Sequence, residues 1–294
     1  MGTPGRLKLN QGPRATVLSR SPWAASDETG HERRLAPYLG RFVRARDSDK
    51  GEDNMMQSEV RGWFITGTDT GVGKTRIACL LLEALAREGR CAVGMKPVAS
   101  GCRETAAGLR NQDAERLLAV SGVAVDYAEV NPYAFAPALA PHLAAHESGV
   151  EIRNEKILDS FQRLRQKAPW MVVEGIGGWM VPLGDLLTMA DVARAMRLPA
   201  ILVVGLRLGC LNHALLTASA IRREGVPLAG WIANQIDPAM THVDENIAAL
   251  NERIEAPLLA RFPYRPPGHH GASAPVFPRE TIMHLTSLTT GRTK

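Results

Sequence analysis

The length, composition and charge of the chain exclude several classes of protein. With 294 residues, of which 45% are hydrophobic and 22% charged, the chain can bury a core, which excludes a wholly disordered or fibrous protein. Its apolar runs are shorter than the roughly 18 residues of a membrane-spanning helix, so no membrane partner is expected. The net charge of +5 is spread along the chain and only 5% of residues are aromatic, which argues against a nucleic-acid partner. The four cysteines show no CxxC spacing, which favours free thiols and a cytoplasmic location.

Residues 1–60 form the first region of the chain. They contain scattered Pro, Gly, Arg and Ser and no sustained apolar run at helical or strand spacing, so we expect a disordered or dispensable extension. The first 26 residues hold four basic and no acidic side chains, as a transit peptide would, but they lack a helical apolar face. Met55 and Met56 stand shortly before the first strong strand, which favours a start-site artefact or a dispensable extension over a targeting signal.

Residues 61–294 show short apolar runs that alternate with segments of helical periodicity. This pattern predicts one α/β domain with a doubly wound, mostly parallel sheet, which the glycine-rich loop at residues 67–75 would make one of the P-loop nucleotide-hydrolase type. The predicted strands are 63–66, 91–95, 170–173, 200–204, 228–232 and 257–262. The predicted helices are 76–88, 154–166, 188–196, 211–223 and 242–253. In such sheets ligands bind beyond the carboxyl ends of the strands, so the residues there are the first candidates for a site.

A glycine-rich loop, Gly-Thr-Asp-Thr-Gly-Val-Gly-Lys-Thr at residues 67–75, follows the first predicted strand directly. Its N–H groups and the following helix start would bind a polyphosphate, Lys74 would reach the β and γ oxygens, and the Thr75 hydroxyl would bind Mg²⁺. Five residues rather than four separate Gly67 from Gly73, so the strict Walker A spacing is not met. A simple glycine-rich turn is the alternative, but it would leave Lys74 at a positive helix end without an anion.

Three more charged side chains are candidates for the site. Two of them stand at the ends of predicted strands and one at a possible helix start. Lys96 follows the second strand and, together with Lys74, would stabilise the charge of a transferred phosphoryl group; alone it would be a solvated lysine. Glu174 ends the third strand as a Walker B-like metal ligand would, or as a solvated acid in a glycine-rich turn. Asp113 would complete a magnesium site with Thr75 and Glu174, or only stabilise a helix start.

The segment Asn234-Gln235-Ile236-Asp237 follows the predicted strand 228–232. It approaches the Asn-Lys-x-Asp base-binding motif of GTP-binding proteins, with Gln in place of Lys. Two interpretations stay open for Asn234, namely a contact to a purine base and an Asx turn before Pro238.

Five segments of the chain, in the same order, resemble the dethiobiotin synthetase family. They are residues 67–75, residues 96–101, Asn131-Pro132-Tyr133 through Pro141-His142, residues 174–182 and residues 208–213. The likeness runs from about Trp63 to about Tyr264. Enzymes of this family use ATP and Mg²⁺ to join CO₂ to 7,8-diaminononanoate and close a ureido ring, which gives dethiobiotin, ADP and phosphate. The resemblance therefore implies a ligase of biotin biosynthesis.

The resemblance also implies roles for individual residues. Lys74 and Lys96 would be catalytic and neutralise the carbamate and the γ-phosphate, while Thr75, Asp113 and Glu174 would hold Mg²⁺. Besides these residues, the nucleotide would contact Gly71, Val72, Gly73, Arg76, Gly175, Ile176, Gly177, Asn234, Gln235, Pro263, Tyr264 and Arg265. The diamine substrate would contact Thr70, Ser100, Gly177, Leu211 and Asn212. A homodimer is implied too, because in the family the carboxylate tail of the substrate binds across a dimer interface.

Two rival functions remain for comparison. A P-loop switch or partition ATPase would carry an extra lysine early in the phosphate-binding loop, and residues 68–71 contain none. A nucleic-acid-binding module led by the basic amino-terminal stretch would bind with an affinity that falls steeply with salt.

Overall fold

The computed structural model describes residues 1–2, 61–266 and 276–290. The expected extension at 1–60 therefore lies outside the described residues, except for the first two. Within the described part, six parallel strands form one sheet in the order β10-β9-β8-β1-β7-β2, which confirms the predicted doubly wound α/β fold. Its strands are β1 (Arg61–Gly67), β2 (Ala92–Met95), β7 (Trp170–Glu174), β8 (Ala200–Leu206), β9 (Leu228–Gln235) and β10 (Leu258–Phe262).

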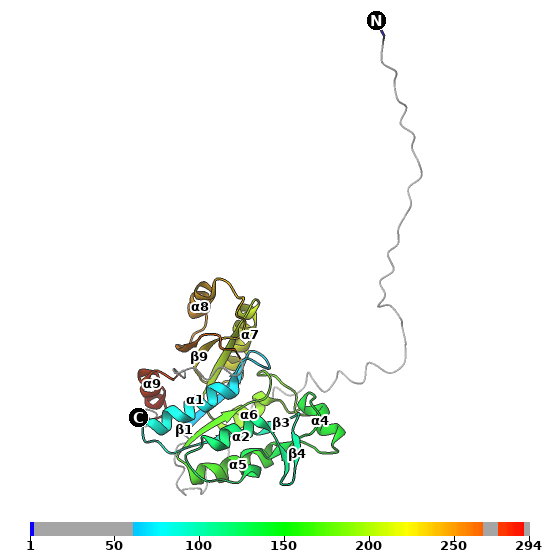
Figure 1. Ribbon diagram of the computed structural model, residues 1–294, viewed down its shortest axis with the longest axis vertical. Helices are drawn as coiled ribbons and strands as arrows, with labels where there is room; N and C mark the ends of the chain where they lie inside the picture. The colour runs from blue at the N-terminus through cyan, green and yellow to red at the C-terminus, as the bar shows by residue number, and fades with distance from the viewer. Residues whose placement is uncertain (3–60, 267–275, 291–294) are drawn as a thin grey trace, which may run out of the picture. The chain divides into compact units, whose positions relative to one another are not determined.

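Helices connect the strands, and two small sheets lie outside the main one (Figure 1). The helices are α1 (Lys74–Arg87), α2 (Gln112–Ala119), α3 (Tyr127–Val130), α4 (Pro141–Glu147), α5 (Asn154–Lys167), α6 (Met189–Met196), α7 (Cys210–Arg223), α8 (Val243–Asn251) and α9 (Arg279–Thr290). The small sheets pair β3 (Val98–Ala99) with β6 (Tyr133–Ala134) and β4 (Arg103–Thr105) with β5 (Gly108–Arg110). In the described residues, each helix is too short or too polar to cross a membrane.

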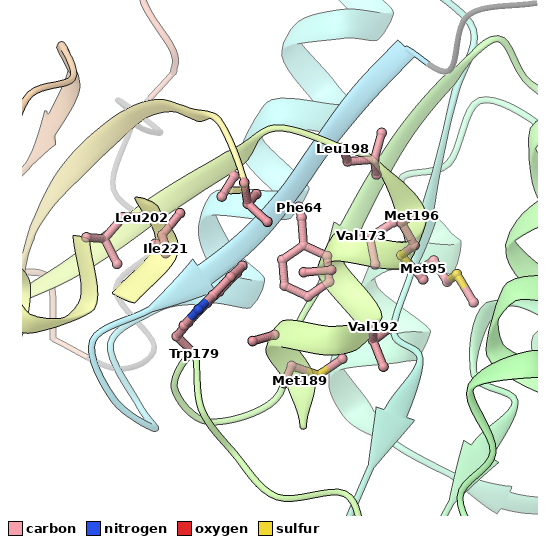
Figure 2. Packing of buried hydrophobic residues seen from close by; sticks show 14 of the residues in the cluster. Phe64, Met95, Val173, Trp179, Met189, Val192, Met196, Leu198, Leu202 and Ile221 are labelled. Atoms are coloured by element: carbon pink, nitrogen blue, oxygen red, sulfur yellow. The ribbon is translucent and has the colours of Figure 1, made fainter. Parts of the chain in front are cut away.

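Each face of the main sheet carries its own hydrophobic cluster, because successive side chains of a strand point to opposite faces. On one face, Trp63 and Ile65 of β1 pack with residues of α1 and α9. On the other face, Phe64 packs with residues of α5, α6, α7 and α8. Figure 2 shows Phe64 with Met189 and Val192 of α6 on one side of it. Helices on both faces explain why the strands are continuously apolar.

The outer edge of β2 is covered by residues 121–131. Gly94 N–H donates to Ser121 Oγ at 3.0 Å, and the N–H of Gly122 donates to the carbonyl of Ala92 at 2.7 Å. Two residues further along, the N–H of Lys96 donates to a carbonyl of the same segment at 2.8 Å. The segment therefore takes the place that a further strand would have at this edge.

Several elements differ from the sequence-based prediction. Strand β9 runs to Gln235 instead of ending at Ile232, because the buried amide of Asn234 is satisfied by the chain and does not have to face water in a turn. Helix α9 was not predicted, since threonines and a serine interrupt its apolar stripe, yet Ile282 and Leu285 are buried. The unpredicted elements are α3, α4, α9 and the strands of the two small sheets, while α2 was expected only as a possible helix start at Asp113.

Candidate active site

The phosphate-binding loop lies where β1 leads into α1. Gly71 and Gly73 have φ angles of 77° and 95°, in the left-handed region that favours glycine. A Cβ on Gly73 would lie 2.4 Å from Asn234 Nδ2, so the loop cannot accept a larger residue there without moving. These glycines let the backbone N–H groups and the start of α1 face a bound anion.

Lys74 is the first residue of α1, and its side chain folds back over the loop. It is 6% exposed, and its Nζ donates a hydrogen bond of 2.8 Å to the carbonyl oxygen of Asp69. Burial, followed by the nearby Lys96 ammonium, lowers the pKa of Lys74 from 10.5 to about 8. A buried ammonium in this setting gains strongly from an incoming phosphate oxygen.

Lys96, directly after β2, lies at the centre of a buried charge cluster. Its Nζ is 2.7 Å from Glu174 Oε1 and 3.3 Å from Asp113 Oδ2. It also donates to the carbonyl of Gly175 at 3.2 Å. Thr75 Oγ1 donates to the same Glu174 oxygen at 2.8 Å. The structure therefore brings together the second lysine and the three residues predicted to hold a metal.

Two opposing effects act on the Lys96 ammonium. Burial lowers the pKa of Lys96, but the carboxylates of Glu174 and Asp113 outweigh burial and leave the pKa raised. The ammonium is therefore charged at neutral pH. The pKa of Lys74 moves the other way, because burial and the neighbouring Lys96 ammonium outweigh the carboxylates there.

The oxygens around Lys96 fit a magnesium ion. Thr75 offers a hydroxyl and Glu174 and Asp113 offer carboxylates, the hard oxygen ligands that Mg²⁺ takes together with water and phosphate. Glu174 Oε2 is buried and has no hydrogen-bond partner within the described part of the chain. A buried carboxylate oxygen is costly to leave without a donor, and a bound cation would satisfy it.

Asp113 reaches Lys96 because the first turn of α2 lies beside the charge cluster. Asn111 caps this helix, since its Oδ1 accepts a hydrogen bond of 3.0 Å from the N–H of Asp113. Sequence reasoning left open whether Asp113 is a metal ligand or an acid that stabilises a helix start. Its place in the first turn and its contact with Lys96 make the two roles compatible.

The residues predicted to contact the diamine lie in three places. Thr70 is exposed in the phosphate-binding loop, and a Cβ on Gly177 would lie 3.6 Å from its Oγ1, so these two are neighbours. Ser100 follows β3, and its carbonyl is hydrogen-bonded to the cap of α2 at 3.4 Å. Leu211 and Asn212 stand in the first turn of α7, and no hydrogen bond among the described residues joins them to the other three.

Asn234 of β9 lies against the phosphate-binding loop. Its Nδ2 donates to the carbonyl of Val72 at 2.8 Å, and its Oδ1 accepts from Arg76 Nη1 at 3.4 Å. The guanidinium of Arg76 lies 5.5 Å from the centre of the Phe262 ring. Burial, with a further contribution from Arg265, lowers the pKa of Arg76. Asn234 thus supports the loop and is not an Asx turn, while its contact to a purine base stays a prediction.

The remaining predicted nucleotide contacts border this region and the loop after β7. Gln235 ends β9 and donates to the carbonyl of Asp237 at 3.2 Å. Pro263 and Tyr264 follow β10, the former exposed and the latter half-buried. Ile176 is half-buried in the loop after β7.

Sequence reasoning missed an ion pair and a hydrogen-bond network at the site. Arg207 Nη2 lies 2.5 Å from Asp69 Oδ2, which ties the end of β8 to the phosphate-binding loop. Tyr127 and Asn131 form the network, which joins Lys96 to the start of α2. Asp69 could have been noticed as an acid inside the loop, but its partner becomes visible only once β8 is known to pair with β1.

Comparison with known proteins gives consistent results. Residues 61–269 match the family model described as an AAA domain. The ATP-dependent dethiobiotin synthetase BioD of Aromatoleum aromaticum (strain DSM 19018 / LMG 30748 / EbN1) is 53% identical over 207 residues, which cover 70% of this chain and 92% of that protein. The BioD protein of Xanthomonas oryzae pv. oryzae (strain PXO99A) is 51% identical over 72% of this chain and 95% of its own length.

A solved structure is also similar, at a greater distance. The septum site-determining protein MinD complexed with Mg-ADP, from Pyrococcus horikoshii OT3, is 17% identical, with a TM-score of 0.45 over 79% of this chain and 96% of that chain. A likeness at this level carries no argument about activity. By contrast, identities of 51 to 53% over more than nine-tenths of the two BioD proteins are high enough to show the family. The chain belongs to the ATP-dependent dethiobiotin synthetases.

Proposed function

We propose that this chain carries out the reaction of its family by the following route. One amine of 7,8-diaminononanoate takes up CO₂ as a carbamate, and a carbamate oxygen attacks the γ-phosphorus of ATP while ADP leaves. The second amine attacks the carbonyl carbon of the mixed anhydride and expels phosphate, which closes the ureido ring. The observation that carries this proposal is the pair of buried ammonium groups, Lys74 and Lys96, close enough to affect each other's charge at the carboxyl edge of the sheet.

The two lysines act at different points of the reaction. Lys74 binds the phosphate oxygens of the nucleotide, which the phosphate-binding loop supports through its N–H groups. Lys96 neutralises the carbamate and the phosphoryl group that it receives. Because both ammonium groups are fixed before the reaction starts, the negative charge that builds up during transfer is stabilised without reorganisation.

Thr75, Asp113 and Glu174 hold Mg²⁺ in this proposal. The ion, when bound, supplies positive charge at the β and γ phosphates and orients the γ-phosphate. The unpartnered Glu174 oxygen and the closeness of the Thr75 hydroxyl support this assignment. Asp113 is the more exposed carboxylate, at 37%, and so is the better placed to act through a bound water.

The other substrate contacts in this proposal are those that the family resemblance implies. Thr70, Ser100 and Gly177 surround the diamine and the carbamate. The nucleotide is held by Gly71, Val72, Gly73, Arg76, Gly175, Ile176, Gly177, Asn234, Gln235, Pro263, Tyr264 and Arg265. The contact of Asn234 with the loop backbone supports its place beside the nucleotide.

The enzyme acts as a homodimer in this proposal, with Leu211 and Asn212 binding the substrate's carboxylate tail across the interface. The N–H groups at the start of α7 suit a carboxylate. Two leucines, Leu208 just before α7 and Leu216 in the middle of it, are 95% and 63% exposed, as expected for residues that a second copy covers. A molecular mass of one chain by light scattering, at the concentration of the assay, would contradict the dimer.

The reaction domain comprises residues 61–294, in the cytoplasm, and residues 1–60 are an extension that the reaction does not need. The four cysteines, all of which are described, are free thiols, which supports a reducing location.

An isotope experiment tests the proposed reaction. Carbon from labelled bicarbonate should enter product only when the diamine, Mg²⁺ and ATP are all present, with one ADP released for each ring closed. A switch or partition ATPase would release ADP at the same rate without the diamine, and that result would refute the proposal.

A further inference from the structure

The backbone of Lys96 is held by one neighbouring segment. Its N–H donates to the carbonyl of Val130 at 2.8 Å, and its carbonyl accepts from Asn131 Nδ2 at 2.7 Å. Asn131 is only 4% exposed, and the same Nδ2 donates to the carbonyl of Tyr133 at 3.1 Å. Both backbone polar groups of Lys96 are therefore satisfied by residues 130 and 131, so the place of the ammonium depends on this segment.

The same segment reaches Asp113 through a second set of hydrogen bonds. The hydroxyl of Tyr127 donates to Asn131 Oδ1 at 3.0 Å and accepts from the N–H of Asn111 at 2.7 Å. Asn111 in turn caps α2 through the N–H of Asp113. A continuous series of hydrogen bonds thus runs from the carbonyl of Lys96 to the backbone of Asp113, while the two side chains meet at 3.3 Å.

We propose that Tyr127 and Asn131 are positioning residues that set the separation of the Lys96 ammonium and the Asp113 carboxylate. The inference rests on the roles proposed above for Lys96 and Asp113. Tyrosine suits this place because its hydroxyl donates one hydrogen bond and accepts another. Without the Tyr127 hydroxyl, the start of α2 and Lys96 are no longer joined by hydrogen bonds.

The test compares Tyr127→Phe with the unchanged full-length protein. The substitution removes one hydroxyl and leaves the N–H of Asn111 and Oδ1 of Asn131 without their partner. The dissociation constant of ATP measured by calorimetry with Mg²⁺ should rise about tenfold, and kcat should fall about tenfold. The dissociation constant of ATP in the presence of EDTA should not change, because the metal side of the site is not used there.

Tyr133→Phe is the matched control. The hydroxyl of Tyr133, at the start of β6 just after this segment, accepts the N–H of Arg153 at 2.9 Å, so this change also removes a tyrosine hydroxyl that is hydrogen-bonded to the backbone. It should lower the melting temperature, by less than Tyr127→Phe because one hydrogen bond is lost instead of two. It should leave the ratio of ATP affinities with and without Mg²⁺ unchanged.

Two further measurements separate positioning from a general loss of stability. In an Asp113→Ala background, Tyr127→Phe should weaken binding of ATP with Mg²⁺ less than twofold further, because its effect passes through Asp113. Asn131→Asp keeps the acceptor for Tyr127 but removes the donor to the Lys96 carbonyl. It should therefore lower kcat severalfold with little change in the affinity for ATP with Mg²⁺.

The proposal is overturned if both tyrosine variants change the affinity ratio equally, or if the effects of Tyr127→Phe and Asp113→Ala add fully. If Tyr127→Phe does not fold, an Asn131→Asp protein with normal kcat overturns it instead. A Lys96→Ala protein with normal turnover would refute the proposed function itself, whatever the tyrosine variants show.

Discussion

Lys74 and Lys96 serve one site but belong to two differently built regions. Lys74 stands in a contiguous loop, whose shape depends on glycine backbone angles and on the start of α1. Lys96 is held by Glu174, which is 78 residues away in the sequence, and by Asn131, which is 35 residues away. One half of the site is thus encoded by a local motif, and the other half by the way distant segments pack. Substitutions should therefore affect the two halves in different ways.

The largest expected effect is on turnover. Lys74→Ala should weaken ATP binding and lower kcat, because the cation that holds the phosphates is lost. Lys96→Ala should lower kcat about a hundredfold or more while ATP still binds. Labelled-bicarbonate incorporation and calorimetry with ATP measure the two quantities. An equal loss of ATP affinity in both variants would erase the distinction between the regions.

Stability without ligands should be lost on substitution of Lys96 and kept or raised on substitution of Lys74. Lys96→Met leaves the buried carboxylate of Glu174 unpaired and should cost about 3–5 kcal/mol of unfolding free energy, measured with urea. Adding Glu174→Gln should recover most of that cost. Lys74→Met should be neutral or stabilising at pH 7, since the lowered pKa shows that the fold disfavours this charge. A large loss for Lys74→Met would show that it is part of the same buried ion pair.

Substitution of the loop glycines tests whether the shape of the loop depends only on its own backbone angles or also on the contact with β9. Gly73→Ala puts a Cβ 2.4 Å from Asn234 Nδ2 and also strains a positive φ, so ATP affinity should fall at least tenfold. Gly71→Ala has the same backbone strain, about 1–2 kcal/mol, but meets no atom within 4 Å. It should weaken ATP binding less. Equal losses would mean that strain alone, without the contact to β9, controls the loop.

A smaller effect should be a dependence of ATP affinity on pH, caused by the charge of Lys74. Its pKa is lowered to about 8, so the free enzyme loses this charge as the pH rises above that value. An anion binds best to the charged form, and the dissociation constant of ATP measured without Mg²⁺ should therefore rise with pH above about 8. Lys74→Arg keeps its charge and should flatten the profile between pH 7 and pH 9. A wild-type profile that is flat in this range would contradict the shift.

The smallest effect should come from removing the first residues of the chain. Removal of residues 1–54 should leave kcat and KM within twofold of the full chain, because the candidate residues all come after residue 60. A nucleic-acid-binding module led by this basic stretch would instead lose its salt-dependent binding on the same deletion. Binding assays with DNA at two salt concentrations distinguish these outcomes.

Sequence reasoning found the first region more fully than the second. The phosphate-binding loop is a contiguous pattern between a strand and a helix, and Lys96 and Glu174 follow from the rule that ligands gather at the carboxyl ends of strands. Asn131 was visible only as part of a family motif without a role. Its function depends on a hydrogen bond to the backbone of Lys96, which neither side-chain type nor spacing reveals.

The end of β9 at Asn234 and Gln235 was also hidden in the sequence, because it too depends on a distant segment. A polar residue before Ile236, Asp237 and Pro238 is typical of a turn, so the predicted strand ends at Ile232, three residues before the end of β9 at Gln235. The amide is buried because the carbonyl of Val72, far away in the sequence, accepts its hydrogen bond. A buried polar side chain at a strand end can thus be predicted only with knowledge of what lies opposite.

The covering of β2 by residues 121–131 has a consequence beyond catalysis. A terminal strand with bare N–H and C=O groups is a template on which another polypeptide can add by β-pairing, the first step toward fibrous aggregates. Here Ser121, Gly122, Val130 and Asn131 already occupy those groups. The same stretch that positions an ammonium group for the reaction thus also covers the edge where such pairing would begin, so a change made there for one purpose would alter the other.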